Sequence, residues 1–151
     1  MLNQPVANFT LAATNNLNFN LQDYLGKNVI LYFYPKDSTP GCTTQGLAFR
    51  DAYSEFQSLN TEIFGISRDS VKSHENFKAK FSFPFELLAD TEEIACGIFG
   101  VMKMKNMYGK QVRGVERSTF IINTAGVLVH EVRGVKVDGH VAAMLDIIKA
   151  L

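Results

Sequence analysis

The feature that most constrains this chain is an apolar run, Val29–Tyr34, followed within a few residues by a Pro-Gly break and a cysteine. The run is rich in β-branched and aromatic residues and lies between Gly26 and Pro35, which is typical of a central strand covered on both faces. Pro40 and Gly41 then interrupt the chain just before helical geometry can begin. The sequence therefore predicts a buried strand, a turn and a helix.

This helix, which we expect to end near Leu59, carries Cys42 at or next to its first position. Its apolar residues recur at helical spacing: Phe49, Ala52, Tyr53 and Phe56. A helix N-terminus presents unpaired N–H groups and a partial positive charge, and both favour a thiolate, which is the nucleophilic form of cysteine. We interpret Cys42 as a reactive thiol; the alternative is a buried cysteine that only fills space.

The spacing of Pro35, Thr39 and Cys42 resembles the peroxidatic motif of peroxiredoxins, and the longer string from Phe33 to Thr43 resembles the PrxQ group, also called bacterioferritin comigratory protein. Four later segments also resemble this group, so that the likeness covers nearly the whole chain: Leu88–Asp90, Phe99–Val101, Met107–Lys110 and Glu116–Ile122. The resemblance implies a thiol-dependent peroxidase that reduces hydrogen peroxide and organic hydroperoxides.

The resemblance also implies a role for each motif residue. Cys42 is expected to attack a peroxide oxygen and become sulfenic acid. The Thr39 hydroxyl is expected to accept from the substrate and orient the thiolate. Backbone N–H groups of Gly41 and Cys42 would bind the peroxide oxygens, and Pro35 would shield the site from water. Arg117 would hold thiolate and peroxide by charge-assisted hydrogen bonds.

Simpler readings compete with three of these roles. Thr39 could be only a turn residue and Pro35 only the end of a strand. Arginines are mostly exposed, and by composition Arg113 and Arg133 are as available as Arg117. Only the resemblance of the segment that begins at Glu116 selects Arg117.

The chain departs from the PrxQ pattern at the resolving cysteine. Leu47 and Lys78 stand at the two positions where members of the group usually carry it. Cys96 remains as a possible resolving residue, and the alternative is that it is a buried structural thiol. We therefore favour a one-cysteine mechanism in which an external thiol reduces the sulfenic acid of Cys42. The competing mechanism joins Cys42 to Cys96 through local unfolding and uses thioredoxin as reductant.

Composition restricts the remaining possibilities. The 151 residues fit a single domain, 1–151, and 15 basic residues balance 15 acidic ones, so no overall field attracts nucleic acid or a membrane. Apolar runs are too short for a membrane span, and the first residues do not resemble a signal peptide, which makes the cytoplasm the expected location. Two cysteines are too few for a disulfide scaffold.

We expect no cofactor and no metal. No Gly-rich phosphate loop follows a strand, and His74, His130 and His140 lack the spacing of metal ligands. The basic segment Lys103–Arg113 is interpreted as a solvated loop rather than a nucleic-acid site. The electron donor is expected to be thioredoxin, glutaredoxin or a low-molecular-weight thiol, and the PrxQ resemblance suggests a monomer.

The order of elements predicts an α/β protein with a central sheet flanked by helices, in a thioredoxin-like fold with a peroxiredoxin-type N-terminal hairpin. Capping residues are expected at Ser70, at Asp90–Glu93 as a capping box, and at Asp138. The segment Gly100–Val115 is predicted to be irregular. Strands are predicted at Val6–Leu11, Leu17–Leu21, Val29–Tyr34, Thr61–Ser67, Phe85–Leu88, Ser118–Asn123 and Val127–Arg133.

Two other functions remain open from the residues. One is a thioredoxin-fold thiol oxidoreductase, although the chain has no C-x-x-C motif. The other is a non-enzymatic redox sensor whose Cys42 oxidises once and signals to a partner. Turnover with catalytic amounts of protein separates an enzyme from such a sensor.

Overall fold

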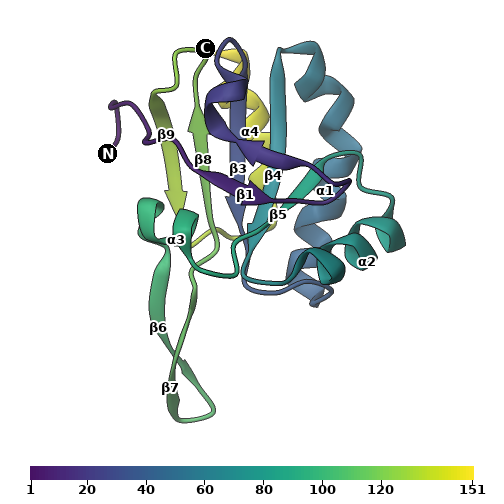
Figure 1. Ribbon diagram of the computed structural model, residues 1–151, viewed down its shortest axis with the longest axis vertical. Coiled ribbons are helices and arrows are strands. Elements are labelled where there is room, and N and C mark those ends of the chain that lie inside the picture. Colours follow the sequence, from purple (N-terminus) through teal and green to yellow (C-terminus); the bar gives the residue numbers. More distant parts are fainter.

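A five-stranded mixed sheet organises the computed structural model, which describes residues 1–151 (Figure 1). Its strand order is β5-β4-β3-β8-β9, with β3, β4 and β5 parallel and β8 and β9 antiparallel to their neighbours. The strands are β3 (Asn28–Phe33), β4 (Thr61–Ser67), β5 (Glu86–Ala89), β8 (Ser118–Ile122) and β9 (Leu128–Arg133). The predicted central strand is confirmed, because β3 lies in the middle and every one of its residues is buried.

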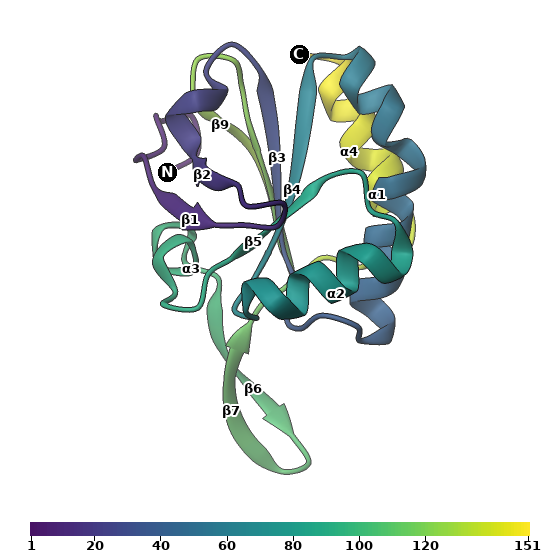
Figure 2. The same ribbon diagram turned by 45° about the vertical axis from the view of Figure 1, so that its right-hand side comes forward.

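Helices cover both faces of this sheet (Figure 2). One face packs against α1 (Pro40–Ser58), α2 (Val71–Phe81) and α4 (His140–Lys149). The other face packs against α3 (Ile94–Phe99) and the N-terminal segment. The alternation of side chains along β3 feeds both cores, since Tyr32 points to the first and Phe33 to the second. The predicted α/β arrangement is therefore confirmed.

The N-terminal hairpin is also confirmed, although both strands are shorter than predicted and the first begins four residues later than Val6. It pairs β1 (Thr10–Ala12) with β2 (Asn18–Asn20) and leads into the short 3₁₀ helix η1 (Leu21–Tyr24). Asn15 and Asn16 form its turn with positive φ angles of 59° and 54°, a conformation that asparagine tolerates better than most residues.

The segment that we predicted to be irregular is instead a second hairpin, and this prediction was wrong. β6 (Met102–Met107) and β7 (Lys110–Val115) pair antiparallel around a two-residue turn, Tyr108-Gly109, whose φ values are 53° and 81°. Such a turn requires positive φ at both central residues. The hairpin projects from the body of the molecule, so most of it is exposed and its strands carry little apolar alternation (Figures 1 and 2).

Two of the three predicted caps need correction, and Ser70 is confirmed because its side chain accepts from the Ser73 N–H at 3.2 Å. α4 begins after Gly139, whose φ is 73°, and Asp138 makes no cap. At α3 the N-cap is Glu93, which has no side-chain cap bond. Asp90 alone accepts from the N–H groups of Ile94 and Cys96, at 2.7 and 2.8 Å, so no reciprocal capping box forms.

No helix combines the length and the apolar character needed to cross a membrane.

Candidate active site

Cys42 lies in the first turn of α1, which a short loop connects to the end of the central strand β3. Pro40 occupies the first helical position, where its missing N–H costs no hydrogen bond, and Thr39 is the N-cap residue. The N–H of Thr43 bonds to the Thr39 carbonyl at 2.9 Å. The N–H groups of Gly41 and Cys42 come too early in the helix for intrahelical acceptors, so they remain available beside the sulfur.

Arg117 brings a positive charge to this sulfur. It precedes β8, which pairs with β3, and its Nη2 donates to Cys42 Sγ at 3.4 Å. Its Nη1 donates to the Gln45 Oε1 at 2.6 Å. Cys42 itself is only 2% exposed, which keeps bulk water from screening the pair. The arginine that contacts the Cys42 thiol is therefore Arg117, and not Arg113 or Arg133.

Gly41 allows the guanidinium to approach the helix. A Cβ built on Gly41 would lie 3.2 Å from Nη2 of Arg117, a tighter approach than ordinary van der Waals contact. A larger side chain would therefore displace the guanidinium from Cys42. Gly41 therefore leaves room for the Arg117 guanidinium, in addition to interrupting the chain before the helix.

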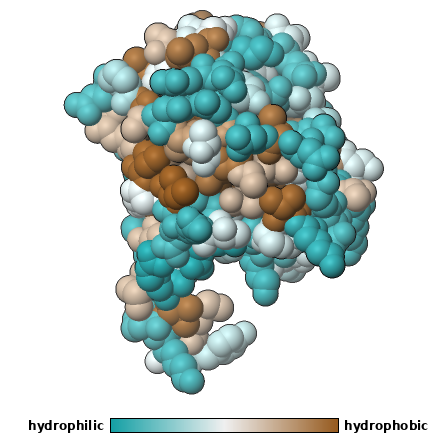
Figure 3. Space-filling model, viewed as in Figure 1, coloured by the Kyte–Doolittle hydropathy of each residue, from teal (hydrophilic) through white to brown (hydrophobic).

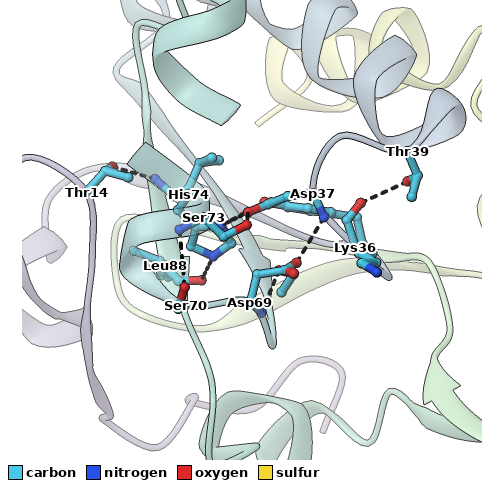
Figure 4. Close-up of polar contacts among 12 residues, drawn as sticks. Thr14, Lys36, Asp37, Thr39, Asp69, Ser70, Ser73, His74 and Leu88 are labelled. Atoms are coloured by element: carbon cyan, nitrogen blue, oxygen red, sulfur yellow. Dashed lines mark hydrogen bonds and ion pairs between the residues drawn. The ribbon is translucent and has the colours of Figure 1, made fainter. Parts of the chain in front are cut away.

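The Thr39 hydroxyl points back along its own loop. Its Oγ1 donates to the Lys36 carbonyl at 2.8 Å (Figure 4). The turn role that competed with a catalytic one is therefore present, yet the hydroxyl proton is fixed in this bond and the oxygen lone pairs remain free to accept. Pro35 is half-buried at the end of β3.

Sequence reasoning missed Gln45 and Tyr32. Gln45 follows Cys42 by three residues, which places both on one face of α1, and this spacing was a usable signal. It is fully buried, and its Nε2 has no protein partner. The Tyr32 ring stacks on Phe49 with ring centroids 4.6 Å apart, and its buried hydroxyl also has no protein partner. Burial, together with the nearby Cys42, raises the pKa of Tyr32 well above its usual range.

The base of the β6–β7 hairpin also approaches this site. Nζ of Lys105 donates to the carbonyl of Val115, two residues before Arg117. Burial and the positive Arg117 lower the pKa of Lys105. The basic segment is largely engaged within the chain, because Lys103 pairs with Glu116 at 3.0 Å and Arg113 with Glu93 at 2.5 Å. The interpretation of this segment as a loop was wrong, and these contacts leave few free cations for a nucleic acid.

Cys96 is separated from Cys42 by the sheet. Cys42 packs in the core beneath α1, α2 and α4, whereas Cys96 packs in the core on the opposite face. Both thiols are free and buried. Burial raises the pKa of the Cys96 thiol, and the Asp90 carboxylate beside it adds to this effect, so Cys96 remains a neutral thiol and a poor nucleophile. The structure does not bring the two cysteines together.

Comparison with known proteins agrees with this geometry. The model of the AhpC/TSA family matches residues 2–131. Peroxiredoxin Bcp of Xanthomonas campestris is 49% identical over 99% of this chain and 95% of its own, and Peroxiredoxin Bcp of Bacillus subtilis is 44% identical over 98% and 94%. Among solved structures, peroxiredoxin Q of Xanthomonas campestris superimposes with a TM-score of 0.90 at 49% identity, over 94% of this chain and 90% of that one. A cysteine mutant of PrxQ from Xylella fastidiosa gives 0.95 at 41% identity, over 99% and 96%.

These similarities extend over almost the entire chain and include a fold shared with thioredoxin-like peroxiredoxins. The alternative of a non-enzymatic sensor is not supported, because the relatives are thiol-dependent peroxidases. The chain belongs to the AhpC/TSA family and is a peroxiredoxin that resembles the Bcp and PrxQ proteins.

Proposed function

We propose that Cys42 is the peroxidatic residue of this thiol-dependent peroxidase. The observation that carries the proposal is the contact of Sγ with Nη2 of Arg117 at the start of α1. The thiolate attacks one oxygen of a hydroperoxide, an S–O bond forms and the O–O bond breaks. The leaving oxygen takes up a proton and departs as water or an alcohol, and Cys42 becomes sulfenic acid.

The neighbouring groups suit the charge that develops in this step. The Thr39 oxygen accepts from the O–H of the hydroperoxide, since its own proton is held by Lys36. The N–H groups of Gly41 and Cys42 and the guanidinium of Arg117 stabilise the negative charge on the leaving oxygen. Gln45 holds the guanidinium in place through Nη1. Pro35 limits access of water from the side of β3.

The substrate class is hydrogen peroxide and organic hydroperoxides. A structure of the bacterioferritin comigratory protein of Xanthomonas campestris, 48% identical to this chain, concerns the alkyl peroxide reduction activity of that protein.

The reduction half of the cycle follows a one-cysteine mechanism. A resolving thiol within the chain would have to be Cys96, which lies behind the sheet and stays protonated. We therefore assign reduction of the sulfenic acid to an external thiol, from thioredoxin, glutaredoxin or a small thiol, acting on a monomer without any cofactor. Such a reductant pool belongs to the cytoplasm. The alternative, a Cys42–Cys96 disulfide, requires α3 and its surroundings to unfold.

Turnover tests the proposal. Catalytic amounts of protein, incubated with an excess of hydrogen peroxide and dithiothreitol, should consume many equivalents of peroxide. Cys42→Ser should abolish this consumption, whereas the matched variant Cys96→Ser should retain it. Retained consumption in Cys42→Ser contradicts the assignment of the peroxidatic residue, and loss in a folded Cys96→Ser supports the two-cysteine alternative.

A further inference from the structure

A buried hydrogen bond joins the loop before Cys42 to α2. Nδ1 of His74 lies 2.7 Å from Oδ2 of Asp37, and both side chains are almost entirely inaccessible to solvent. Nε2 of His74 lies 2.8 Å from the carbonyl of Leu88 in β5. Both ring nitrogens of His74 therefore lie within hydrogen-bond distance of an acceptor oxygen.

The Asp37 carboxylate collects two further donors. The Tyr34 hydroxyl donates to Oδ1 at 2.6 Å, and the Ser73 hydroxyl donates to Oδ2 at 2.8 Å. Burial raises the pKa of Tyr34 well above its usual range, so this phenol keeps the proton that it donates. Together with His74, these contacts bring three side chains, from the end of β3 and from α2, onto the Asp37 carboxylate.

The backbone of the same loop is anchored on β4. The N–H of Asp37 donates to Oδ2 of Asp69 at 2.9 Å (Figure 4). The hydroxyl of Ser67, at the end of β4, donates to the same oxygen. Figure 4 shows these side chains gathered between the loop and α2, with Thr39 at the far end of the loop. The loop is thus tied to α2 and to the ends of the parallel strands.

This anchoring has a direct consequence for Cys42. Ser38 follows Asp37 with a φ of 61°, a left-handed conformation that a non-glycine residue adopts rarely and that surrounding contacts must hold. Thr39 comes next, and its bond to the Lys36 carbonyl closes the turn. Cys42 follows three residues later. The conformation of the loop therefore determines where the first turn of α1 lies relative to Arg117.

Asp37, Asp69 and His74 are also residue types that bind metals, and their ligand atoms lie within 4.8 Å of one another. Those atoms are, however, already hydrogen-bonded: Nδ1 with Oδ2 of Asp37, and Oδ2 of Asp69 with two donors. A cation would have to displace the proton between His74 and Asp37 and the donors on Asp69. The contacts present are those of a hydrogen-bonded network that fixes a loop.

We propose that His74 and Asp37 are positioning residues for peroxide reduction, which hold the Pro35–Thr39 loop so that Cys42 meets Arg117 and the free N–H groups of α1. The inference rests on the proposed function, because it assumes that Cys42 is the peroxidatic residue. It extends that function to two residues that touch neither the thiol nor the peroxide. Loss of the His74–Asp37 contact should slow the reaction of Cys42 with peroxide, which needs this geometry. It should leave alkylation of Cys42, which needs only a thiolate, nearly unchanged.

Two neutral variants of His74 separate its two contacts. The amide nitrogen of asparagine falls near the place of Nδ1, so His74→Asn keeps a donor to Asp37. The amide nitrogen of glutamine falls near Nε2, so His74→Gln keeps the bond to Leu88 and leaves Asp37 without this donor. The rate constant of Cys42 with hydrogen peroxide is compared, for each variant, with its rate constant for alkylation by iodoacetamide.

We expect His74→Gln to slow the peroxide reaction by about 100-fold, as misplacement of a reacting group by about 1 Å can do, and to change alkylation by less than about threefold. His74→Asn should restore the peroxide rate to within about tenfold of the unmodified protein. Ser70→Ala is the matched control, since it removes the cap of the same helix and leaves Asp37 untouched. It should lower the melting temperature and leave both rates unchanged.

An unchanged peroxide rate in His74→Gln overturns the inference, as does an equal loss in Ser70→Ala or a parallel loss of alkylation. If His74→Gln does not fold, Tyr34→Phe serves in its place, because it removes one donor to Asp37 without leaving a buried histidine unpaired. A folded Tyr34→Phe with an unchanged peroxide rate would equally refute the proposal. If the unmodified protein consumes no peroxide, the proposed function fails before the inference is reached.

Discussion

Replacement of Arg117 by lysine should slow the oxidation of Cys42 while preserving the positive charge. The guanidinium contacts two partners at once, Sγ of Cys42 at 3.4 Å and Oε1 of Gln45 at 2.6 Å. A single ammonium cannot reproduce this fork, so one charge-assisted hydrogen bond is lost. Such a bond contributes about 1.5–3 kcal/mol. At about 1.4 kcal/mol per factor of ten, the peroxide rate constant should fall by about 10- to 150-fold.

Stopped-flow measurement of Cys42 oxidation at several peroxide concentrations gives this rate constant directly. Arg113→Lys is the matched control, because Arg113 pairs with Glu93 at the hairpin and makes no contact with Cys42. Its peroxide rate should equal that of the unmodified protein. If Arg117→Lys reacts within about twofold of the unmodified protein, the two contacts do not stabilise the transition state and the argument from fork geometry is refuted.

Three further predictions concern packing, pH and the second thiol. Gly65→Ala should lower the free energy of unfolding by about 1–3 kcal/mol in denaturant titration, because the added Cβ would lie 2.8 Å from the Tyr32 ring and from Leu87; an unchanged midpoint would contradict this. Burial lowers the pKa of His140 to about 4 from 6.5, so the unfolded chain binds the extra proton between these values, and stability should fall as the pH falls through that window. The loss should be about 2 kcal/mol after allowance for solvent screening and should disappear in His140→Gln, whereas an equal loss in that variant would assign it to other groups. Cys96→Ala should keep the peroxide rate and lower stability by about 1 kcal/mol, as a small cavity does, and a slower peroxide reaction would show that Cys96 acts in the first step.

The main elements were predictable because local signals agreed with the tertiary structure. The apolar run of β3, the Pro-Gly break and the helical spacing after Cys42 all favour the same arrangement, which the structure contains. Ser70 likewise combines a good capping residue with an apolar helical face. A segment whose local sequence signals agree with its tertiary packing can be predicted from the sequence alone.

The wrong predictions concern segments whose conformation depends on contacts with distant parts of the chain. The β6–β7 hairpin has no buried face over most of its length, so its Met and Lys residues alternate without an apolar pattern, and the Tyr108-Gly109 turn was its main signal. Glu93 was expected to complete a capping box. It pairs instead with Arg68, in the loop after β4, and with Arg113, in the hairpin. These ion pairs lower the pKa of Glu93 to about 2.

The hairpin also carries much of the exposed apolar surface. Met104, Met107, Tyr108 and Val112 are all exposed there, and Figure 3 shows apolar residues among polar ones over this projection. Residues that face solvent on both sides of a strand pair give no core signal, which explains why neither periodicity nor composition predicted this element.

In the candidate site, too, residues that are close in sequence were predictable and residues brought together by tertiary contacts were not. Pro35, Thr39, Gly41 and Cys42 lie within one short segment, so their proximity follows from the motif. Arg117 comes from a distant part of the chain and could be placed only by family resemblance, whereas the structure places it through the pairing of β3 with β8. The Asp37–His74 contact joins a loop to a separate helix, and no local pattern reports such a pair.

The most direct test of the central claim is the intact mass of the reduced protein after one equivalent of hydrogen peroxide, measured with and without a sulfenic-acid trap. The account predicts the gain of one oxygen, captured by the trap and mapped to Cys42. A loss of two hydrogens without trapping would mean a Cys42–Cys96 disulfide and would contradict the one-cysteine mechanism. No change in mass at Cys42 would contradict its assignment as the peroxidatic residue.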